Sequence, residues 1–148
     1  MSTKINIELT KELGDLLVFS MKNKDKAKQV NIGVPSPKII RQANNFGVDL
    51  NNCNVYIDSY AVRHSLNKHG LTSVKIQDGV IPLCPFDLIF IPDLLQNGQV
   101  VAFEKDCLTI KRDGLGVYGG IVCEVRMSMR KGTRVYLKTM YNIKKKGG

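Results

Sequence analysis

Both histidines of the chain lie in one short stretch, YAVRHSLNKHG, at residues 60–70. His64 and His69 are five positions apart, and Arg63 and Lys68 lie beside them. Imidazole titrates near neutral pH, so a histidine can take up or give a proton in catalysis, while neighbouring cations can bind an anionic substrate. The stretch therefore indicates either an active-site cluster or the ordinary polar surface of a helix.

The two histidines point in different directions if this stretch is a helix. At about 100° per residue, His69 falls near the centre of the buried stripe, whereas His64 and Lys68 share a flank. The apolar residues of that stripe are Ala61, Val62 and Leu66. If the last turn lies over the last strand of the chain, His69 contacts Thr139 and Tyr141. The alternative is structural for both residues, with His69 hydrogen-bonded and partly buried and His64 simply exposed.

The positive charge is concentrated in the last quarter of the chain. Of the net charge of +9, residues 111–148 contribute +8 (10 Lys and Arg minus 2 Asp and Glu), and residues 1–110 contribute +1 (12 minus 11). This distribution favours a polyanionic partner, nucleic acid before an anionic membrane surface. The sequence has neither a membrane-spanning apolar run nor the pattern of a signal peptide, so we expect a cytoplasmic protein without a membrane partner.

The four cysteines do not have the spacing of a zinc site. Each lies among apolar neighbours, and no Cys-x-x-Cys pair occurs. Cysteine in such surroundings usually behaves as a small buried apolar residue. We therefore expect Cys53, Cys84, Cys107 and Cys123 to be buried thiols, and we expect no metal or other cofactor.

Helix signals precede strand signals along the chain. A weak helical pattern surrounds Leu13, Pro37 begins a second helix, and Asp58 or Ser59 caps a third that runs to His69. The segment PFDLIFIPDLLQ predicts a further helix that Pro92 kinks or splits. CNVYID is an isolated strand candidate, and four β-rich stretches follow at the end: VVAFE, CLTIKR, GGIVCEVRM and TRVYLKTMY.

This order predicts an α+β fold in which N-terminal helices pack on one face of a four-stranded antiparallel sheet. Strand alternation then sorts the side chains of the sheet into two faces. The core face is expected to hold Leu108, Ile110, Ile121, Cys123, Val125, Met127, Val135, Leu137, Thr139 and Tyr141. The open face is expected to hold Lys111, Glu124, Arg126, Arg134, Tyr136 and Lys138. A basic open face with a tyrosine suits a single-stranded nucleic acid, since cations bind phosphates and a ring stacks on a base.

Three stretches resemble a known family in their order and content: GVPSPKII, VYIDSYAVRHSLNKHG and IVCEVRMSMRKGTRVYLKTMYNIKK. They are similar to phage-associated nuclease domains of the barnase–EndoU–colicin–RelE-like superfamily. The His-x-x-x-Lys-His-Gly helix end, the segment DLIFIPDLLQNG and the Leu-x-Thr-Met-Tyr strand recur in that family. On this basis we expect an N-terminal appendage at residues 1–30, a nuclease-like domain at 31–143 and a basic disordered tail at 144–148.

The resemblance implies a toxin of a mobile element that cleaves RNA, often tRNA, without a metal ion. It further implies that the 2′-hydroxyl of the RNA is the nucleophile, that the protein acts in the cytoplasm of a host cell, including after delivery by a phage, and that an immunity or antitoxin protein is a candidate partner. The residues that match the catalytic pattern are His64, Lys68, His69, Thr139 and Tyr141. The expected RNA and phosphate ligands are Arg63, Lys111, Arg126, Arg134, Tyr136 and Lys138.

Three alternatives remain open from the sequence. Glu124 is a rival general base, which would place the site on the open face of the sheet. The fold and its basic face could also serve a non-catalytic nucleic-acid-binding or virion-associated module. A metal site made of histidines and cysteines is the weakest alternative, because His64 and His69 diverge around the helix.

Overall fold

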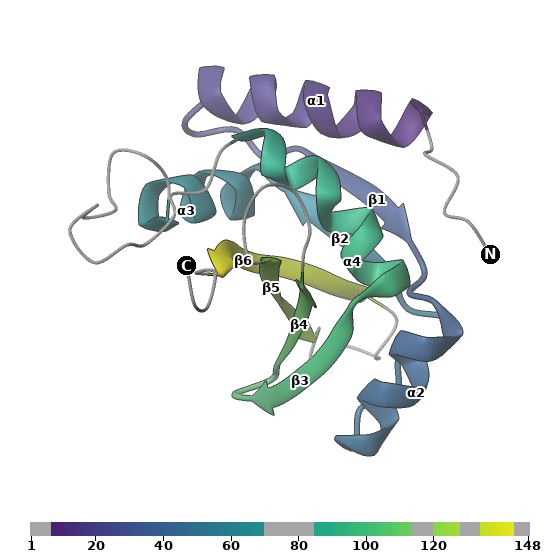
Figure 1. Ribbon diagram of the computed structural model, residues 1–148. Helices are drawn as coiled ribbons and strands as arrows, with labels where there is room; N and C mark the ends of the chain where they lie inside the picture. Colours follow the sequence, from purple (N-terminus) through teal and green to yellow (C-terminus); the bar gives the residue numbers. More distant parts are fainter. Residues whose placement is uncertain (1–6, 70–84, 114–119, 128–133, 144–148) are drawn as a thin grey trace.

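The computed structural model describes residues 7–69, 85–113, 120–127 and 134–143. These residues form an α+β domain in which helices pack on a six-stranded sheet (Figure 1). The α+β class agrees with the order of helix and strand signals in the sequence.

The sheet is mixed and larger than expected. Its strands are β1 (Gln29–Gly33), β2 (Asn54–Asp58), β3 (Gln99–Glu104), β4 (Cys107–Asp113), β5 (Gly120–Met127) and β6 (Arg134–Ile143). They lie in the order β1-β2-β6-β5-β4-β3, with β2 and β6 parallel and the other neighbours antiparallel. The prediction of a four-stranded antiparallel sheet is therefore wrong. Alternation of polar and apolar residues locates a strand, but it does not say which strand pairs with it.

Two of the helices, α2 and α3, begin at side-chain caps. They are α1 (Ile7–Lys22), α2 (Pro37–Asn45), α3 (Ser59–His69), the 3-10 helix η2 (Pro85–Phe90) and α4 (Ile91–Asn97). Ser36 caps α2 through its side-chain oxygen, with Pro37 in the first turn. The Asp58 carboxylate caps α3 by accepting a hydrogen bond of 2.7 Å from the backbone N–H of Ala61. Pro92 lies directly after the boundary between η2 and α4, so the predicted split is confirmed. No helix in the described part of the chain is long and apolar enough to cross a membrane.

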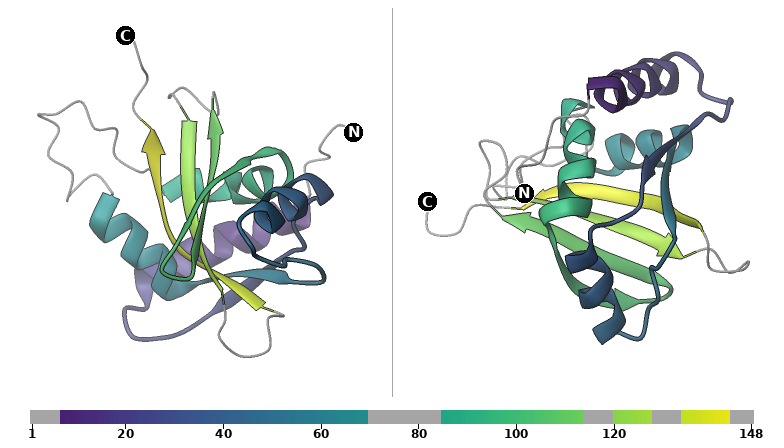
Figure 2. Two further views of the ribbon diagram at one scale, coloured as in Figure 1. Left: turned by 90° about the horizontal axis from the view of Figure 1, so that it is seen from below. Right: turned by 90° about the vertical axis from the view of Figure 1, so that its right-hand side faces the viewer.

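The core lies between the sheet and the helices α1, α3 and α4. Seen from below, the strands β4, β5 and β6 lie in front of α1 and α3, so these helices cover the far face of the sheet (Figure 2). Cys123, Val125 and Leu137 on the sheet and Val62 on α3 belong to one buried apolar cluster. Burial of each large apolar side chain contributes about 1.5–3 kcal/mol to stability, before the entropy cost of ordering the chain.

α1 adds to this same core. Its leucines Leu13, Leu16 and Leu17 are buried, which confirms the helical pattern expected around them. Residues 7–30 thus pack against the rest of the described molecule through α1 and β1. Whether they constitute a separate appendage, as the division at residue 30 supposes, stays a prediction.

α3 lies along the C-terminal half of β6. β2 pairs only with residues 134–136 of β6, and α3 follows β2 directly in the chain. Among the described residues no strand takes the place of β2 beyond residue 136, and α3 packs beside the remainder of β6 (Figures 1 and 2). The helix that carries both histidines is therefore a neighbour of the strand segment that carries Thr139 and Tyr141.

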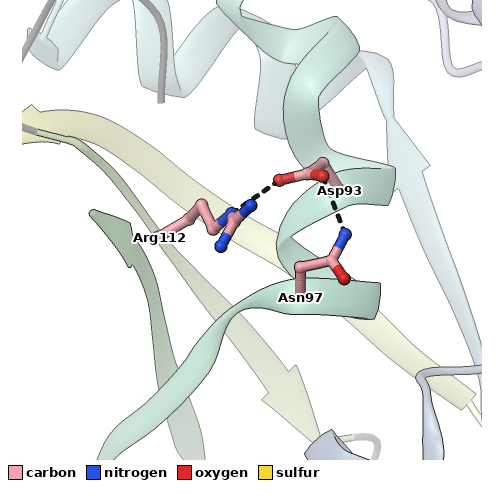
Figure 3. Close-up of polar contacts among 3 residues, drawn as sticks. All are labelled: Asp93, Asn97 and Arg112. Atoms are coloured by element: carbon pink, nitrogen blue, oxygen red, sulfur yellow. Dashed lines mark hydrogen bonds and ion pairs between the residues drawn. The ribbon is translucent and has the colours of Figure 1, made fainter. Parts of the chain in front are cut away.

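A polar contact joins α4 to the sheet on the core side. The Arg112 Nε on β4 donates to the Asp93 carboxylate on α4 at 3.0 Å, and the Asn97 side-chain amide donates to the other oxygen of Asp93 at 2.9 Å (Figure 3). Both side chains of the ion pair are partly exposed, so solvent weakens their attraction. The contact fixes the position of α4 along β4 more than it adds to stability.

Candidate functional site

The register of β6 changes at Lys138. Leu137 pairs with Val125 on β5, and the next pair along the two strands joins Thr139 to Glu124. Lys138 is thus an extra residue with no partner of its own on β5, as in a β-bulge. Beyond this point the alternation of β6 is reversed relative to its N-terminal half.

This reversal moves Thr139 and Tyr141 to the face of Glu124. Residues that are directly opposite on antiparallel strands point to the same side of the sheet, and Tyr141 pairs with Val122 as Thr139 pairs with Glu124. Val122 is buried but does not join the main apolar cluster, in keeping with its place on the other face. The expectation that Thr139 and Tyr141 lie on the core face is therefore wrong. We call this side of the sheet, opposite the described helices, the open face.

The open face combines polar, aromatic and charged side chains in rows that cross the strands. Its described members on the strands β2, β4, β5 and β6 include Tyr56, Cys107, Thr109, Lys111, Val122, Glu124, Arg126, Tyr136, Thr139 and Tyr141. The expected positions of Lys111, Glu124, Arg126 and Tyr136 on this face are confirmed by their cross-strand partners.

The central row carries a carboxylate between two hydroxyls. Glu124 on β5 pairs with Thr109 on β4 and with Thr139 on β6. Thr139 is buried, with only 3% of its surface exposed, and its Oγ1 has no hydrogen-bond partner among the described residues. A buried hydroxyl without a partner costs stability, so such groups are often retained for a role in binding or catalysis.

A second row joins Tyr141 to Lys111 through Val122. Burial, and then the negative charge of Glu124, raise the pKa of the Tyr141 hydroxyl above its ordinary value. The phenol is therefore protonated at neutral pH and can donate a hydrogen bond or a proton. Lys111 lies 3.6 Å from the Asp113 carboxylate in an ion pair that is partly exposed.

A third row is aromatic. The rings of Tyr56 and Tyr136 stack with their centroids 5.7 Å apart and their planes at 30°. Arg126, which is exposed, pairs with Tyr136 on the adjacent strand. Stacked rings beside a guanidinium group are suited to an unpaired base and its phosphate.

Arg63 has contacts that favour a structural role. Its guanidinium donates to the carbonyl oxygens of Asn23 at 2.6 Å, Lys26 at 3.2 Å and Ser20 at 3.4 Å, and it lies over the ring of Tyr60 at 4.8 Å. A cation at these carbonyls satisfies the C-terminal end of α1 and the turn after it. We therefore leave Arg63 out of the candidate site, contrary to its expected role as a phosphate ligand.

The histidine helix α3 packs against β6 on the core side of the sheet, opposite the open face, and the structure describes only part of it. His64 is exposed on α3, as expected. The side chains of Lys68 and His69 lie outside the described residues, as does that of Arg134 on β6, so their expected roles stay predictions. Lys138 is exposed at the bulge.

In the described ranges, no three His, Cys, Asp or Glu side chains come together as metal ligands. Cys53, Cys107 and Cys123 are buried free thiols, as expected, and Cys84 lies outside these ranges.

Comparisons with known proteins give no match to this chain among family models, curated proteins or solved structures. The resemblance to phage-associated nucleases thus stays a prediction that depends on the three sequence stretches.

Sequence reasoning missed Tyr56 as a site residue. Alternation in NVYID already places Tyr56 opposite Val55 and Ile57, both of which are buried. Its position beside Tyr136 depends on the parallel pairing of β2 with β6, for which the sequence carries no local signal.

Proposed function

We propose that this chain is a metal-independent RNA endonuclease whose active site lies on the open face around Glu124. The observation that carries this proposal is the register shift at Lys138. Through it, two hydroxyl residues of β6 come to lie beside a half-buried carboxylate, on the same face as an arginine and two stacked tyrosines.

Each group has a role in transesterification of RNA. Glu124 accepts the proton of the 2′-hydroxyl, whose oxygen attacks the adjacent phosphorus atom. The bond from phosphorus to the 5′-oxygen breaks, and an acid gives that oxygen a proton, which leaves a 2′,3′-cyclic phosphate and a 5′-hydroxyl end. Tyr141 is the candidate acid, because it lies on the same face of the sheet as Glu124. Arg126 and Lys111 stabilise the charge that develops on the phosphate oxygens.

The finer identity of the protein belongs to the same proposal. The concentration of positive charge in residues 111–148 supports a polyanionic substrate. Action on tRNA in the cytoplasm of a host cell, as a toxin of a phage or another mobile element, and control by an immunity or antitoxin protein are supported by the sequence resemblance alone.

The decisive experiment is incubation of the purified protein with tRNA in the presence of EDTA, followed by analysis of the ends produced. We expect 2′,3′-cyclic phosphate and 5′-hydroxyl ends. Glu124→Gln should reduce the cleavage rate by about 10²–10⁴-fold, the usual contribution of a general base, while RNA binding persists.

Glu104→Gln is the matched control. Glu104 pairs with Cys107 and lies on the same face, three strands from Thr139, so the same loss of charge should leave cleavage unchanged. Cleavage that disappears on chelation would contradict the metal-independent mechanism. Full activity of Glu124→Gln would remove Glu124 from it.

The second candidate is a non-catalytic module that binds single-stranded nucleic acid. The stacked pair of Tyr56 and Tyr136 beside Arg126 favours it, since binding needs no general base. Salt-sensitive binding of RNA without any cleavage, weakened by Tyr136→Ala and not by Glu124→Gln, would support this function over the enzyme.

A further inference from the structure

α1 exposes a second apolar stripe on its solvent side. Ile7, Val18 and Met21 are 79%, 52% and 62% exposed, and at about 100° per residue they fall within about 60° of one another around the helix. Gly14 lies in the same stripe. The buried side of α1, formed by Leu13, Leu16, Leu17 and Ser20, is centred about 120° away. None of the described elements covers the stripe.

The stripe is symmetric about its glycine. Ile7 and Met21 each lie seven positions from Gly14. A copy of α1 packed antiparallel, with a two-fold axis at Gly14, therefore brings Ile7 against the partner's Met21. A Cβ added to Gly14 would have no heavy atom within 4 Å, so no side chain separates the two backbones at the axis.

The charges beside the stripe are also self-complementary. The exposed side chains on one flank are Glu8, Lys11, Asp15 and Lys22. In the antiparallel pair, Lys22 is offset from the partner's Glu8 by two residues, about 3 Å along the axis, and Lys11 is offset equally from the partner's Asp15. The two-fold axis repeats each of these opposite-charge pairs.

The net charge of α1 favours a second copy at this surface. α1 contains two lysines and three acidic residues, so its net charge is 2 − 3 = −1, whereas the whole chain has a net charge of +9. Two copies of a strongly basic protein repel each other least where their surfaces are not basic.

We propose that this chain forms a homodimer through α1, with the two helices antiparallel and Gly14 at the two-fold axis. The 16 residues of α1 span only about 24 Å, so the contact is smaller than the roughly 800 Å² per partner of a typical stable interface. We therefore expect a dissociation constant in the micromolar range or weaker. The dimer does not depend on the proposed nuclease function, because it is measured without RNA.

Sedimentation velocity over about 1 µM to 1 mM protein tests the dimer, since this range brackets small, weak interfaces. Val18→Glu should raise the dissociation constant by about tenfold or more, because it buries a carboxylate at the contact. Phe46→Glu is the matched control: Phe46 is another exposed apolar residue, outside α1, and its substitution should leave the dissociation constant unchanged.

A charge exchange tests the orientation of the helices. Glu8→Lys should weaken the dimer, and adding Lys22→Glu to the same chain should restore it, since both contacts then have reversed signs. Oxidative cross-linking in a Cys84→Ser background gives a second readout, because the other native thiols, at positions 53, 107 and 123, are buried. Gly14→Cys should cross-link rapidly, whereas Ile7→Cys alone should not.

Two results would overturn the proposal. Rapid cross-linking of Ile7→Cys to itself would indicate parallel helices. A monomer over the whole concentration range, with no cross-linking of Gly14→Cys, would exclude the dimer.

Discussion

Thr139 has the most unusual environment among the candidate site residues. Its side chain is buried beside Glu124, and its hydroxyl has no hydrogen-bond partner among the described residues. Such a group lowers the stability of the free protein, but it can bind a substrate or orient a general base. Active sites often lose stability in this way in exchange for activity. The two contributions can be separated by removing the hydroxyl while keeping the volume of the side chain.

Thr139→Val should raise stability and lower activity together. Removal of an unpaired buried hydroxyl should increase the free energy of unfolding by about 1 kcal/mol, and valine is also favoured in strands. RNA cleavage should fall by about tenfold or more if the hydroxyl positions Glu124 or the phosphate. Urea unfolding and single-turnover cleavage measure the two effects.

Thr109→Val is the control on the other side of Glu124. Thr109 is only partly buried, so its substitution should change stability little. A loss of stability in Thr139→Val would show that the hydroxyl has a partner in solution and would contradict this account of the residue.

At the level of elements, the bulge in β6 creates the candidate site. The strand supplies Val135 and Leu137 to the core before Lys138 and places Thr139 and Tyr141 on the open face after it. A one-residue change of register reverses every side chain beyond it. The bulge lies where β2 ends and α3 begins to cover β6, so the change of face coincides with a change of neighbour.

Deletion of Lys138 should therefore remove the bulge and keep the site. Thr139 then follows Leu137 directly, so regular alternation still places Thr139 beside Glu124 and Tyr141 beside Val122. We expect RNA cleavage to persist and stability to change by less than about 1 kcal/mol, since Lys138 is exposed. Deletion of Met140 is the contrast: it turns Tyr141 towards the core, which should lower stability by about 1–3 kcal/mol and reduce cleavage. Urea unfolding and the cleavage assay compare the two deletions, and a loss of cleavage on deletion of Lys138 alone would contradict its assignment as the extra residue.

The turn from α4 into β3 has little room for a side chain. A Cβ at Gly98 would collide with the Leu94 carbonyl oxygen and would lie 2.8 Å from the Ile110 side chain. Gly98→Ala should therefore lower the free energy of unfolding by about 1–3 kcal/mol, because backbone and core must shift. Gln99→Ala, at an exposed neighbouring position, should have little effect in the same urea unfolding experiment. Equal stability of the two variants would argue against this packing.

At the scale of the whole molecule, the sheet separates a thiol-containing core from the polar open face. Cys123 lies in the core directly before Glu124 in β5. Burial, and then the charge of Glu124, raise the pKa of its thiol from 9.0 to about 12. The folded protein thus holds a proton that the unfolded chain releases above pH 9.

Stability should accordingly fall at alkaline pH. The contribution of Cys123 is complete below pH 9 and is lost as the pH rises towards 12, with a slope approaching about 1.4 kcal/mol per pH unit. Cys123→Ala should be less stable at neutral pH because of lost packing, and its stability should decline less steeply between pH 9 and pH 10.5. Urea unfolding at several pH values measures both slopes. Parallel curves for the two proteins would contradict the raised pKa.

The local features of the fold could be predicted from the sequence. Ser36 with Pro37, Asp58 and Pro92 act within one turn of the chain, and each begins or splits a helix as expected. The four strands from β3 to β6 follow from alternation, as do the core positions up to Leu137. Capping and alternation depend on residues that are near in sequence, so they can be recognised without knowledge of the rest of the molecule.

Only the tertiary structure decided how these parts combine into a site. The parallel pairing of β2 with β6 brings Tyr56 to Tyr136, and the bulge at Lys138 brings Thr139 and Tyr141 to Glu124. Both depend on contacts between segments far apart in the chain, whose choice is made by packing of the whole core and not by local preference. By itself the sequence determined which residues could do chemistry; the register of β6 decided which of them meet.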